Sequence, residues 1–470
     1  MSDDDLCYLT AAQALSQFRQ GKLSPLDVLD AQIARAERYE PSINAFTETY
    51  FEEARKKARE SEARWKDPQS ARPLEGLTVA VKDSQAIAGK RTTHGSLTLA
   101  DNIDTVTDPM IERLIGAGAI VHARSTTPEF CLSSVCQSRL WGKTVNPFNP
   151  AFGPGGSSGG SASALAIGTT TLATGTDIGG SIRIPASCCG VVGYKPPKGR
   201  NPDGAPARLD PYNHCGPLTR SVADAALVQN VVSGAHPSDH ASLREQVIID
   251  AGMSGVKGMR IAYSMDLGYA PVSDEIRANT AATLDLLRDL GAEVKEVDLG
   301  WTQDIDEAAL IWFRVMHFGR DVVRRFRETP ELLTNYACEA AQDALRLDPD
   351  TVPHAWDVQD AMFQDFSRVM DGCDVLICPT TAIPALPSDD DVLERDLIVN
   401  GRPVHHEYGW VLTHQFNMLY NCPVLAIPSG RSASGVPTGI QIVGNTFDDK
   451  AVFRVANSIE TQGPTWPRAV

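Results

Sequence analysis

The sequence has no long apolar run and no basic cluster. No stretch of its 470 residues approaches the roughly 18 uninterrupted apolar residues of a membrane-spanning helix, so we expect no membrane partner. A formal charge of −16 disfavours nucleic-acid backbones and anionic membrane surfaces as partners. The first residues, MSDDDLCYLT, are acidic and lack the basic and apolar segments of a secretory signal, which predicts a cytoplasmic protein.

Signals for metal ions and disulfides are also absent. The ten cysteines include no C-x-x-C pair, and their scatter indicates neither a zinc site nor a disulfide framework. We interpret most of them as small buried hydrophobes in a reducing compartment. His405 and His406 are adjacent and lack the i, i+4 spacing of a helical metal pair. We therefore expect no metal and no other cofactor.

Helix and strand signals alternate along the whole chain. Apolar segments at 77–84 and 119–124 predict buried strands, and helical periodicity appears between such segments. A helix that starts at Ser24 is expected to end before Pro41. The alternation favours an α/β fold, with a sheet covered by helices on both faces. No Pro/Gly-rich linker divides the chain, so residues 1–470 are expected to form one domain.

A glycine- and serine-rich centre distinguishes residues 153–185. A flexible linker fits this region poorly, because ALAIG and TTTLATGT within it are compatible with a helix and a strand. Residues 155–159 match G-x-S-x-G, the nucleophile-elbow pattern of α/β-hydrolases, with Ser157 as nucleophile. No downstream histidine lies in a recognisable loop context. This pattern keeps an α/β-hydrolase-type esterase open as one interpretation.

Three segments in order resemble the amidase signature family. They are VAVKDS (79–84), GGSSGGS (155–161) and GTDIGGSIRIP (175–185). The resemblance extends over nearly the whole chain. It implies a large mixed, twisted sheet covered by helices, in a single domain. Within that domain, the signature core would cover about 75–220 and a variable, substrate-shaping part about 240–420.

The resemblance implies a hydrolase that cleaves an amide-type C–N bond through a seryl acyl-enzyme. Carried over to this sequence, Ser181 is the acylated nucleophile, Ser157 the bridging serine and Lys82 the base, and the peptide bond before Ser157 is cis. A serine hydroxyl needs a base within hydrogen-bond reach. Lysine can be that base only when it is neutral, which burial at the end of an apolar strand favours. No metal or organic cofactor is required.

The segment around Ser181 carries the expected oxyanion site. The expected donors are the backbone N–H groups of Ile178, Gly179, Gly180 and Ser181. Asp177 is expected to orient this loop or to pair with Arg183, and a structural ion pair is favoured over a substrate clamp for Arg183. Ser158 is expected to cap the helix that follows it.

The sequence does not identify the substrate. The family cleaves primary amides, anilides, hydrazides and some carbamates. We expect Thr127 and Cys131 near the substrate. An aromatic-rich segment also offers pocket walls, although core packing is the favoured interpretation for its members: Trp312, Phe313, His317 and Phe318. The apolar character of these residues favours a small aryl or alkyl amide as the partner.

Two further functions stay open. The family includes the glutaminase subunit of a tRNA-dependent amidotransferase, but TTPEF (126–130) stands where that subunit usually carries N-M-D-E-F. The second open alternative is a non-catalytic family member, although all three catalytic positions and the oxyanion glycines are present. A homodimer is also left open.

Overall fold

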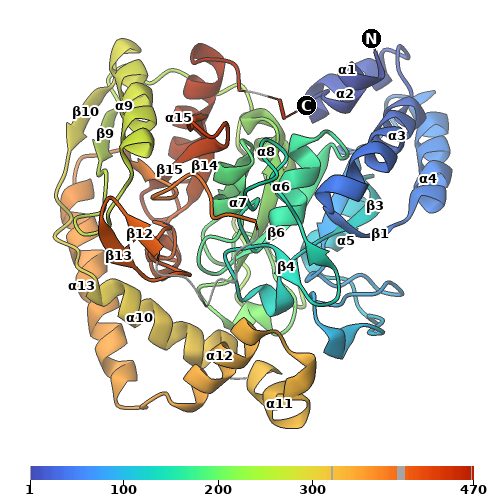
Figure 1. The fold of residues 1–470 in the computed structure, drawn as a ribbon. Coiled ribbons are helices and arrows are strands. Elements are labelled where there is room, and N and C mark those ends of the chain that lie inside the picture. The colour runs from blue at the N-terminus through green and yellow to red at the C-terminus, as the bar shows by residue number, and fades with distance from the viewer. Residues whose placement is uncertain (1, 319–320, 389–396, 467, 470) are drawn as a thin grey trace.

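A mixed 11-stranded sheet forms the centre of the computed structural model, which describes residues 2–318, 321–388, 397–466 and 468–469 (Figure 1). In order across the sheet, the strands are β1 (Phe46–Thr49), β3 (Ile120–Ser125), β2 (Thr78–Lys82), β6 (Leu172–Asp177), β8 (His214–Thr219), β7 (Val192–Lys195), β14 (Val424–Arg431), β15 (Pro437–Gly444), β11 (Val375–Pro379), β9 (Arg260–Tyr263) and β10 (Glu293–Glu296). Two hairpins lie outside this sheet: β4 (Gln137–Ser138) with β5 (Gly142–Lys143), and β12 (Leu397–Val399) with β13 (Arg402–Val404). Because β7 pairs with β14, the two halves of the chain share one sheet.

Helices surround the sheet. Those in the described residues are α1 (Asp3–Cys7), α2 (Ala11–Arg19), α3 (Pro25–Ile43), α4 (Phe51–Trp65), α5 (Pro109–Gly116), α6 (Gly159–Ala166), α7 (Arg183–Cys188), α8 (Val222–Val232), α9 (Asp274–Asp289), α10 (Asp304–Trp312), α11 (Asp321–Glu328), α12 (Asn335–Leu345), α13 (Thr351–Met370), α14 (Gln415–Met418) and α15 (Asp449–Gln462). None is long and apolar enough to cross a membrane.

The side-chain alternation of β2 shows how both faces of the sheet are covered. Val79 and Val81 pack with Leu114 of α5 in one buried cluster. Ala80 points the other way and packs with Leu165 of α6 in a second cluster. A strand that is apolar at successive positions can bury both of its faces in this way. The predicted α/β fold, with helices on both faces of a large mixed sheet, is confirmed.

One predicted helix boundary is wrong. Helix α3 continues past Pro41 to Ile43 and ends at Asn44, which has a left-handed φ of 57°. The N–H of Asn44 closes the last turn by donating to the carbonyl of Glu40. A proline removes only its own N–H. The last turn of α3 therefore accommodates Pro41.

A helical region between β10 and β11 covers one side of the site. Helix α10 continues directly into a π-helix at Phe313–Phe318, and α12 and α13 pack against these segments. Phe313 belongs to the same buried cluster as Ile178 and Ile184 from the glycine-rich region. The chain segments that carry the predicted catalytic motifs and the variable part thus meet in one core.

Candidate active site

Strand β2 ends at Lys82, inside the protein. All five of its residues are buried, and Lys82 has no exposed surface. This burial lowers the pKa of Lys82 from the ordinary value of a lysine, because desolvation disfavours the ammonium form. The strand therefore supplies an amine that is shifted toward its neutral, basic form.

The Lys82 amine contacts two hydroxyl groups. Its Nζ lies 2.6 Å from Ser157 Oγ and 2.9 Å from Thr176 Oγ1. Ser157 follows a cis peptide bond after Gly156, as the resemblance implies, and precedes α6. The hydrogen-bond partner of Ser157 is thus a lysine rather than a histidine. The role of Thr176 was missed, although it stands beside Asp177 in the recognised motif.

Ser158 links two segments but does not cap α6 with its side chain. It occupies the N-cap position, yet its side chain makes no capping hydrogen bond. Its hydroxyl instead donates to the Thr176 carbonyl at 3.5 Å, and its backbone N–H donates to the Ser181 carbonyl at 3.1 Å. The predicted side-chain cap is wrong because the neighbouring β6 competes for the hydroxyl. The backbone contact ties the Ser157 turn to the Ser181 loop.

The Ser181 loop runs from the end of β6 to the start of α7. Ser181 is 9% exposed and lines a cavity, whereas Ser157 behind it is fully buried. Gly180 has a left-handed φ of 124°, and a Cβ atom there would lie 2.1 Å from Thr413 Oγ1. Only glycine can occupy this position without moving the loop. The loop is therefore fitted closely against the segment that carries Thr413.

A buried ion pair holds this loop in place. Asp177 accepts hydrogen bonds from Arg183 Nε at 3.0 Å and Nη2 at 2.9 Å, and both side chains have no exposed surface. Burial alone would raise the pKa of Asp177, but the Arg183 guanidinium holds it well below its usual range. Arg183 also donates to the Thr413 carbonyl. Arg183 is therefore a loop anchor that does not reach the cavity.

The ion pair corrects the predicted oxyanion site. The N–H of Gly180 donates to Asp177 Oδ1 at 2.8 Å, so it is not available to a substrate oxygen. Ile178, Gly179 and Ser181 line the cavity. Their N–H groups remain as the candidate oxyanion donors of this loop.

The cavity in front of Ser181 has a volume of about 40 Å³. It is lined by Cys131, Leu132, Ser133, Ser134, Gly156, Ile178, Gly179, Ser181, Ile184, Phe313, His317, Glu407, Tyr408 and Val411. Phe313 and His317 are pocket walls, and Phe313 is at the same time part of the buried core, so both interpretations hold for it. Trp312 lines a different pocket, and the side chain of Phe318 lies outside the described part of the chain.

Two predicted neighbours of the substrate differ in position. Cys131 lines the cavity, and it also interacts electrostatically with Lys82. Thr127 does not line the cavity; its hydroxyl lies 3.4 Å from the Cys131 thiol. Thr127 therefore contacts a residue of the cavity wall and is not itself part of that wall.

Glu407 is a buried carboxylate that sequence reasoning missed. It accepts hydrogen bonds from the Ser133 hydroxyl at 2.5 Å, the Ser134 hydroxyl at 2.7 Å and the Ser134 N–H at 2.9 Å. Burial raises the pKa of Glu407 above its usual value. No local pattern around HHEY (405–408) pointed to the site, since the partners of Glu407 lie more than 270 positions away.

No group of three or more histidine, cysteine or acidic side chains among the described residues is arranged to hold a metal ion. The polar side chains around Ser181 instead offer hydroxyls, one amine, one thiol, one imidazole and one carboxylate. This set suits proton transfer and nucleophilic attack.

Comparison with known proteins agrees with this geometry. The Amidase family model matches residues 27–453. An acylamidase of Rhodococcus erythropolis is 32% identical over 469 residues, 99% of this chain and 97% of the relative, and a glutamyl-tRNA(Gln) amidotransferase subunit of Synechococcus sp. (strain CC9605) is 31% identical over 493 residues, 96% of each. The crystal structure of a bacterial aryl acylamidase of the amidase signature family superposes with a TM-score of 0.91 at 27% identity, covering 97% of both chains. The chain therefore belongs to the amidase signature family and is an amide-hydrolysing enzyme.

Proposed function

We propose that this enzyme cleaves small, apolar aryl or alkyl amides through an acyl-enzyme on Ser181, with Ser157 as proton relay and Lys82 as base. The observation that carries the proposal is the 2.6 Å contact between Lys82 Nζ and Ser157 Oγ at a fully buried position. Burial lowers the pKa of Lys82 and so favours the neutral amine, which is the form that can accept a proton. The family relationship and the likeness to an aryl acylamidase support the same reaction class.

The proposed steps follow from these positions. Ser157 passes its proton to Lys82 and takes the proton of Ser181, whose Oγ attacks the substrate carbonyl. The N–H groups of Ile178 and Gly179 stabilise the negative charge that develops on the carbonyl oxygen. Ser157 then donates a proton to the departing nitrogen, since an amide anion is a very poor leaving group. Water hydrolyses the acyl-enzyme by the same transfers.

The cavity supports a small and uncharged substrate group. A site needs about 10–15 Å³ to hold one water, so about 40 Å³ admits only a few heavy atoms. No lysine or arginine is among the described residues that line it, and burial lowers the pKa of His317 to about 4, which keeps that imidazole neutral. The buried carboxyl of Glu407 further disfavours anionic groups. A neutral, apolar group is the best match.

A labelling experiment tests the nucleophile. We expect a fluorophosphonate to modify Ser181, detected by mass spectrometry of the peptide, and the Ser181→Ala variant to lose the label and the hydrolysis of a substrate anilide. Ser158→Ala is the matched control, because it removes a nearby hydroxyl that the mechanism does not use. Label on Ser157 in the unaltered enzyme would support the nucleophile-elbow interpretation and contradict the proposal.

A second experiment tests the relay. The Lys82→Ala variant should lose more activity toward an anilide than toward an activated ester of the same acid, because the ester needs less protonation of its leaving group. Equal losses on both substrates would count against proton donation through Ser157. Absence of both turnover and labelling on a broad substrate panel would favour a non-catalytic protein.

The glutaminase alternative has one specific support, the relatives named as glutamyl-tRNA(Gln) amidotransferase subunits. Against it, the described residues that line the cavity include no lysine or arginine for the carboxylate of glutamine, and burial lowers the pKa of the lining His317 to about 4. Ammonia release from glutamine, measured with and without added partner proteins, separates the two functions. Light scattering of the purified chain in the same experiment reports whether a homodimer forms.

A further inference from the structure

A second and larger pocket lies on the other side of the α10 terminus. Its volume is about 470 Å³, within the range of sites for small organic ligands, and it shares no lining residue with the cavity at Ser181. Trp312 lines this pocket, whereas the next residue, Phe313, lines the catalytic cavity. The described residues that line it are Pro211, Tyr212, Trp312, Trp356, Gln359, Asp360, Phe363, Met418, Leu419, Tyr420, Asn421, Cys422 and Thr446.

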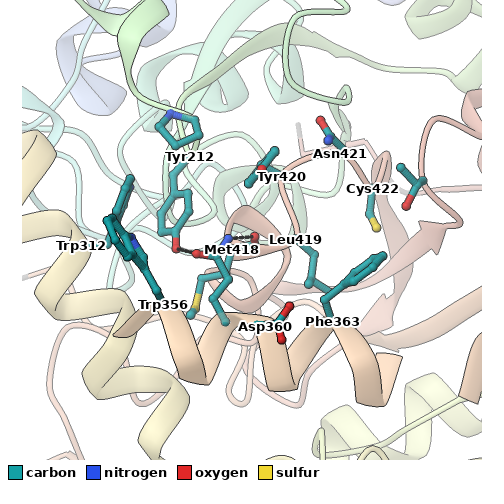
Figure 2. A pocket seen from close by; sticks show the side chains of 13 residues that line it. Tyr212, Trp312, Trp356, Asp360, Phe363, Met418, Leu419, Tyr420, Asn421 and Cys422 are labelled. Atoms are coloured by element: carbon teal, nitrogen blue, oxygen red, sulfur yellow. Dashed lines mark hydrogen bonds between the residues drawn. The ribbon is translucent and has the colours of Figure 1, made fainter. Parts of the chain in front are cut away.

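One face of α13 forms a wall of aromatic side chains. Figure 2 shows Trp356 near Trp312 at one end of the pocket, Phe363 at the other end, and Asp360 between them. Trp356 is 57% exposed and Phe363 is 43% exposed. The core-facing stripe of α13 is formed by other residues: Ala355, Met362, Phe366 and Met370. The exposed aromatic rings are therefore not needed to attach the helix to the core.

The inner wall of the pocket is held in a fixed arrangement. The Tyr212 hydroxyl donates to Gln359 Oε1 at 2.8 Å, and Gln359 Nε2 donates to the Met418 carbonyl at 2.7 Å (Figure 2). The rings of Tyr212 and Trp312 lie 5.0 Å apart. A ligand would therefore meet a preformed aromatic surface, which lowers the entropic cost of binding.

The charged side chain in the lining of this pocket is acidic. Asp360 is its charged lining residue, and no lysine, arginine or histidine is among the lining residues that the structure describes. Gln364 donates a hydrogen bond to Asp360 Oδ2 at 2.6 Å, but this neutral amide leaves the carboxylate charge in place. The faces of aromatic rings also carry negative potential. Carboxylate and rings together favour a cation.

We propose that this pocket is a second, non-catalytic binding site for a small organic cation with an apolar body, such as an aryl- or alkylammonium ion. The cationic head lies near Asp360 and against the ring of Trp356, and the apolar body packs on the remaining aromatic wall. The charge complementarity selects this ligand class over neutral and anionic molecules of the same shape. The inference does not depend on the proposed roles of Lys82, Ser157 or Ser181.

The test compares three probes of similar size: phenyltrimethylammonium, its neutral isostere tert-butylbenzene, and benzenesulfonate. The enzyme has seven tryptophans. Binding is followed by ¹⁹F NMR on the full-length enzyme in which these residues are replaced by 5-fluorotryptophan. Tryptophan-to-phenylalanine variants assign the signals of Trp312 and Trp356. We expect the ammonium probe to shift both signals and to bind at least several-fold more tightly than either other probe.

Two variants locate the cation. A cation–π contact contributes about 0.5–2 kcal/mol, so Trp356→Ala should weaken binding of the ammonium probe roughly 2- to 30-fold. Asp360→Asn should weaken it several-fold and reduce its salt dependence. The matched controls are Leu345→Ala, an exposed apolar residue outside the pocket, and Asp357→Asn, an exposed carboxylate on the same helix. Both controls should bind the probe as the unaltered enzyme does.

Several outcomes would overturn this proposal. Equal binding of tert-butylbenzene would show a merely apolar groove, and unchanged affinity in Trp356→Ala or Asp360→Asn would place the cation elsewhere. The pocket would instead be a protein contact surface if no probe bound and Trp356→Ala converted a dimer into a monomer in light scattering. All three side chains that are changed on α13 are exposed, so the variants should fold.

Discussion

The proposed chemistry depends most on the protonation of one buried amine. Lys82 has no exposed surface, and burial lowers its pKa. The neighbouring Cys131 acts in the opposite direction and raises the pKa of Lys82 through its electrostatic interaction and a hydrogen bond, and Cys136 and Asp177 add to this effect. The balance between burial and these interactions sets the pH at which the amine becomes a base. A substitution at Cys131 can therefore retune the reaction without removing a catalytic group.

For this single residue, we predict how Cys131→Ala changes the pH dependence of kcat/KM. The lysine must be neutral to act, so activity rises as pH rises through its pKa. Removing the sulfur lowers that pKa further, and the acidic limb of the kcat/KM profile for an anilide should move to lower pH. Cys338→Ala, on α12 away from the cavity, is the control and should leave the profile unchanged. A shift to higher pH, or no shift, would contradict this account of Cys131.

Among the elements, the loop between β6 and α7 is the most constrained. Its carboxylate, Asp177, binds two backbone N–H groups, those of Gly180 and Ile182, in addition to Arg183. Thr413 donates to the Gly179 carbonyl at 2.6 Å from the opposite side. A loop held from both sides keeps its remaining N–H groups in place before the substrate arrives, which is the requirement for stabilising an oxyanion.

We therefore predict that Gly180→Ala strongly reduces turnover. The left-handed φ and the 2.1 Å approach to Thr413 Oγ1 leave no room for a methyl group, so the loop must move. Loss of one oxyanion donor typically costs about 10²–10³ in rate, and we expect a decrease in kcat of that order with the circular dichroism spectrum retained. Gly21→Ala is the control, since Gly21 also has a left-handed φ but no atom within 4 Å of the added Cβ. A kcat of Gly180→Ala within a few-fold of that of the unaltered enzyme would refute the requirement for glycine at this position.

On the scale of the whole molecule, one sheet connects distant parts of the chain. Within the expected signature core of about 75–220, β7 pairs with β14, and β14 in turn pairs with β15 near the C-terminus. That core cannot complete its sheet alone, because removing β14 would leave the edge of β7 unpaired. The single domain over 1–470 stays a prediction that this pairing supports.

A thermal unfolding experiment tests the single domain. We expect tryptophan fluorescence and far-ultraviolet circular dichroism to give coincident transitions, because both halves contribute to one sheet. As a control, a cut at the exposed Asn400–Gly401 turn between β12 and β13 should leave the halves associated. Two separated transitions would show that the two parts fold independently.

Stability should also depend on pH through Glu460 on α15. Its carboxylate accepts the N–H of Val222 at the start of α8, and burial raises its pKa to about 7. The folded protein then holds a proton that the unfolded chain releases near pH 4.5, so this contribution to stability is present at low pH and is lost as pH rises toward about 7. Glu460→Gln should flatten the decline in the free energy of unfolding over this window by up to roughly 3 kcal/mol. Urea titrations measure this slope, and the exposed Glu62→Gln serves as control; an unchanged slope in Glu460→Gln would contradict the prediction.

From the sequence alone, the alternation of helices and strands could be predicted, and the resemblance of three short motifs named the three residues of the proposed relay. Those features are local: strand β2 is a continuous apolar run that ends in Lys82, and Ser157 and Ser181 stand in short motifs of fixed composition. Tertiary structure decided which groups meet them. Thr176 reaches Lys82 across strands, Glu407 reaches Ser133 and Ser134 from more than 270 positions away, and the Gly180 N–H is already bound by Asp177. Such pairings leave no periodic pattern in a sequence, because hydrogen bonds and burial depend on three-dimensional proximity.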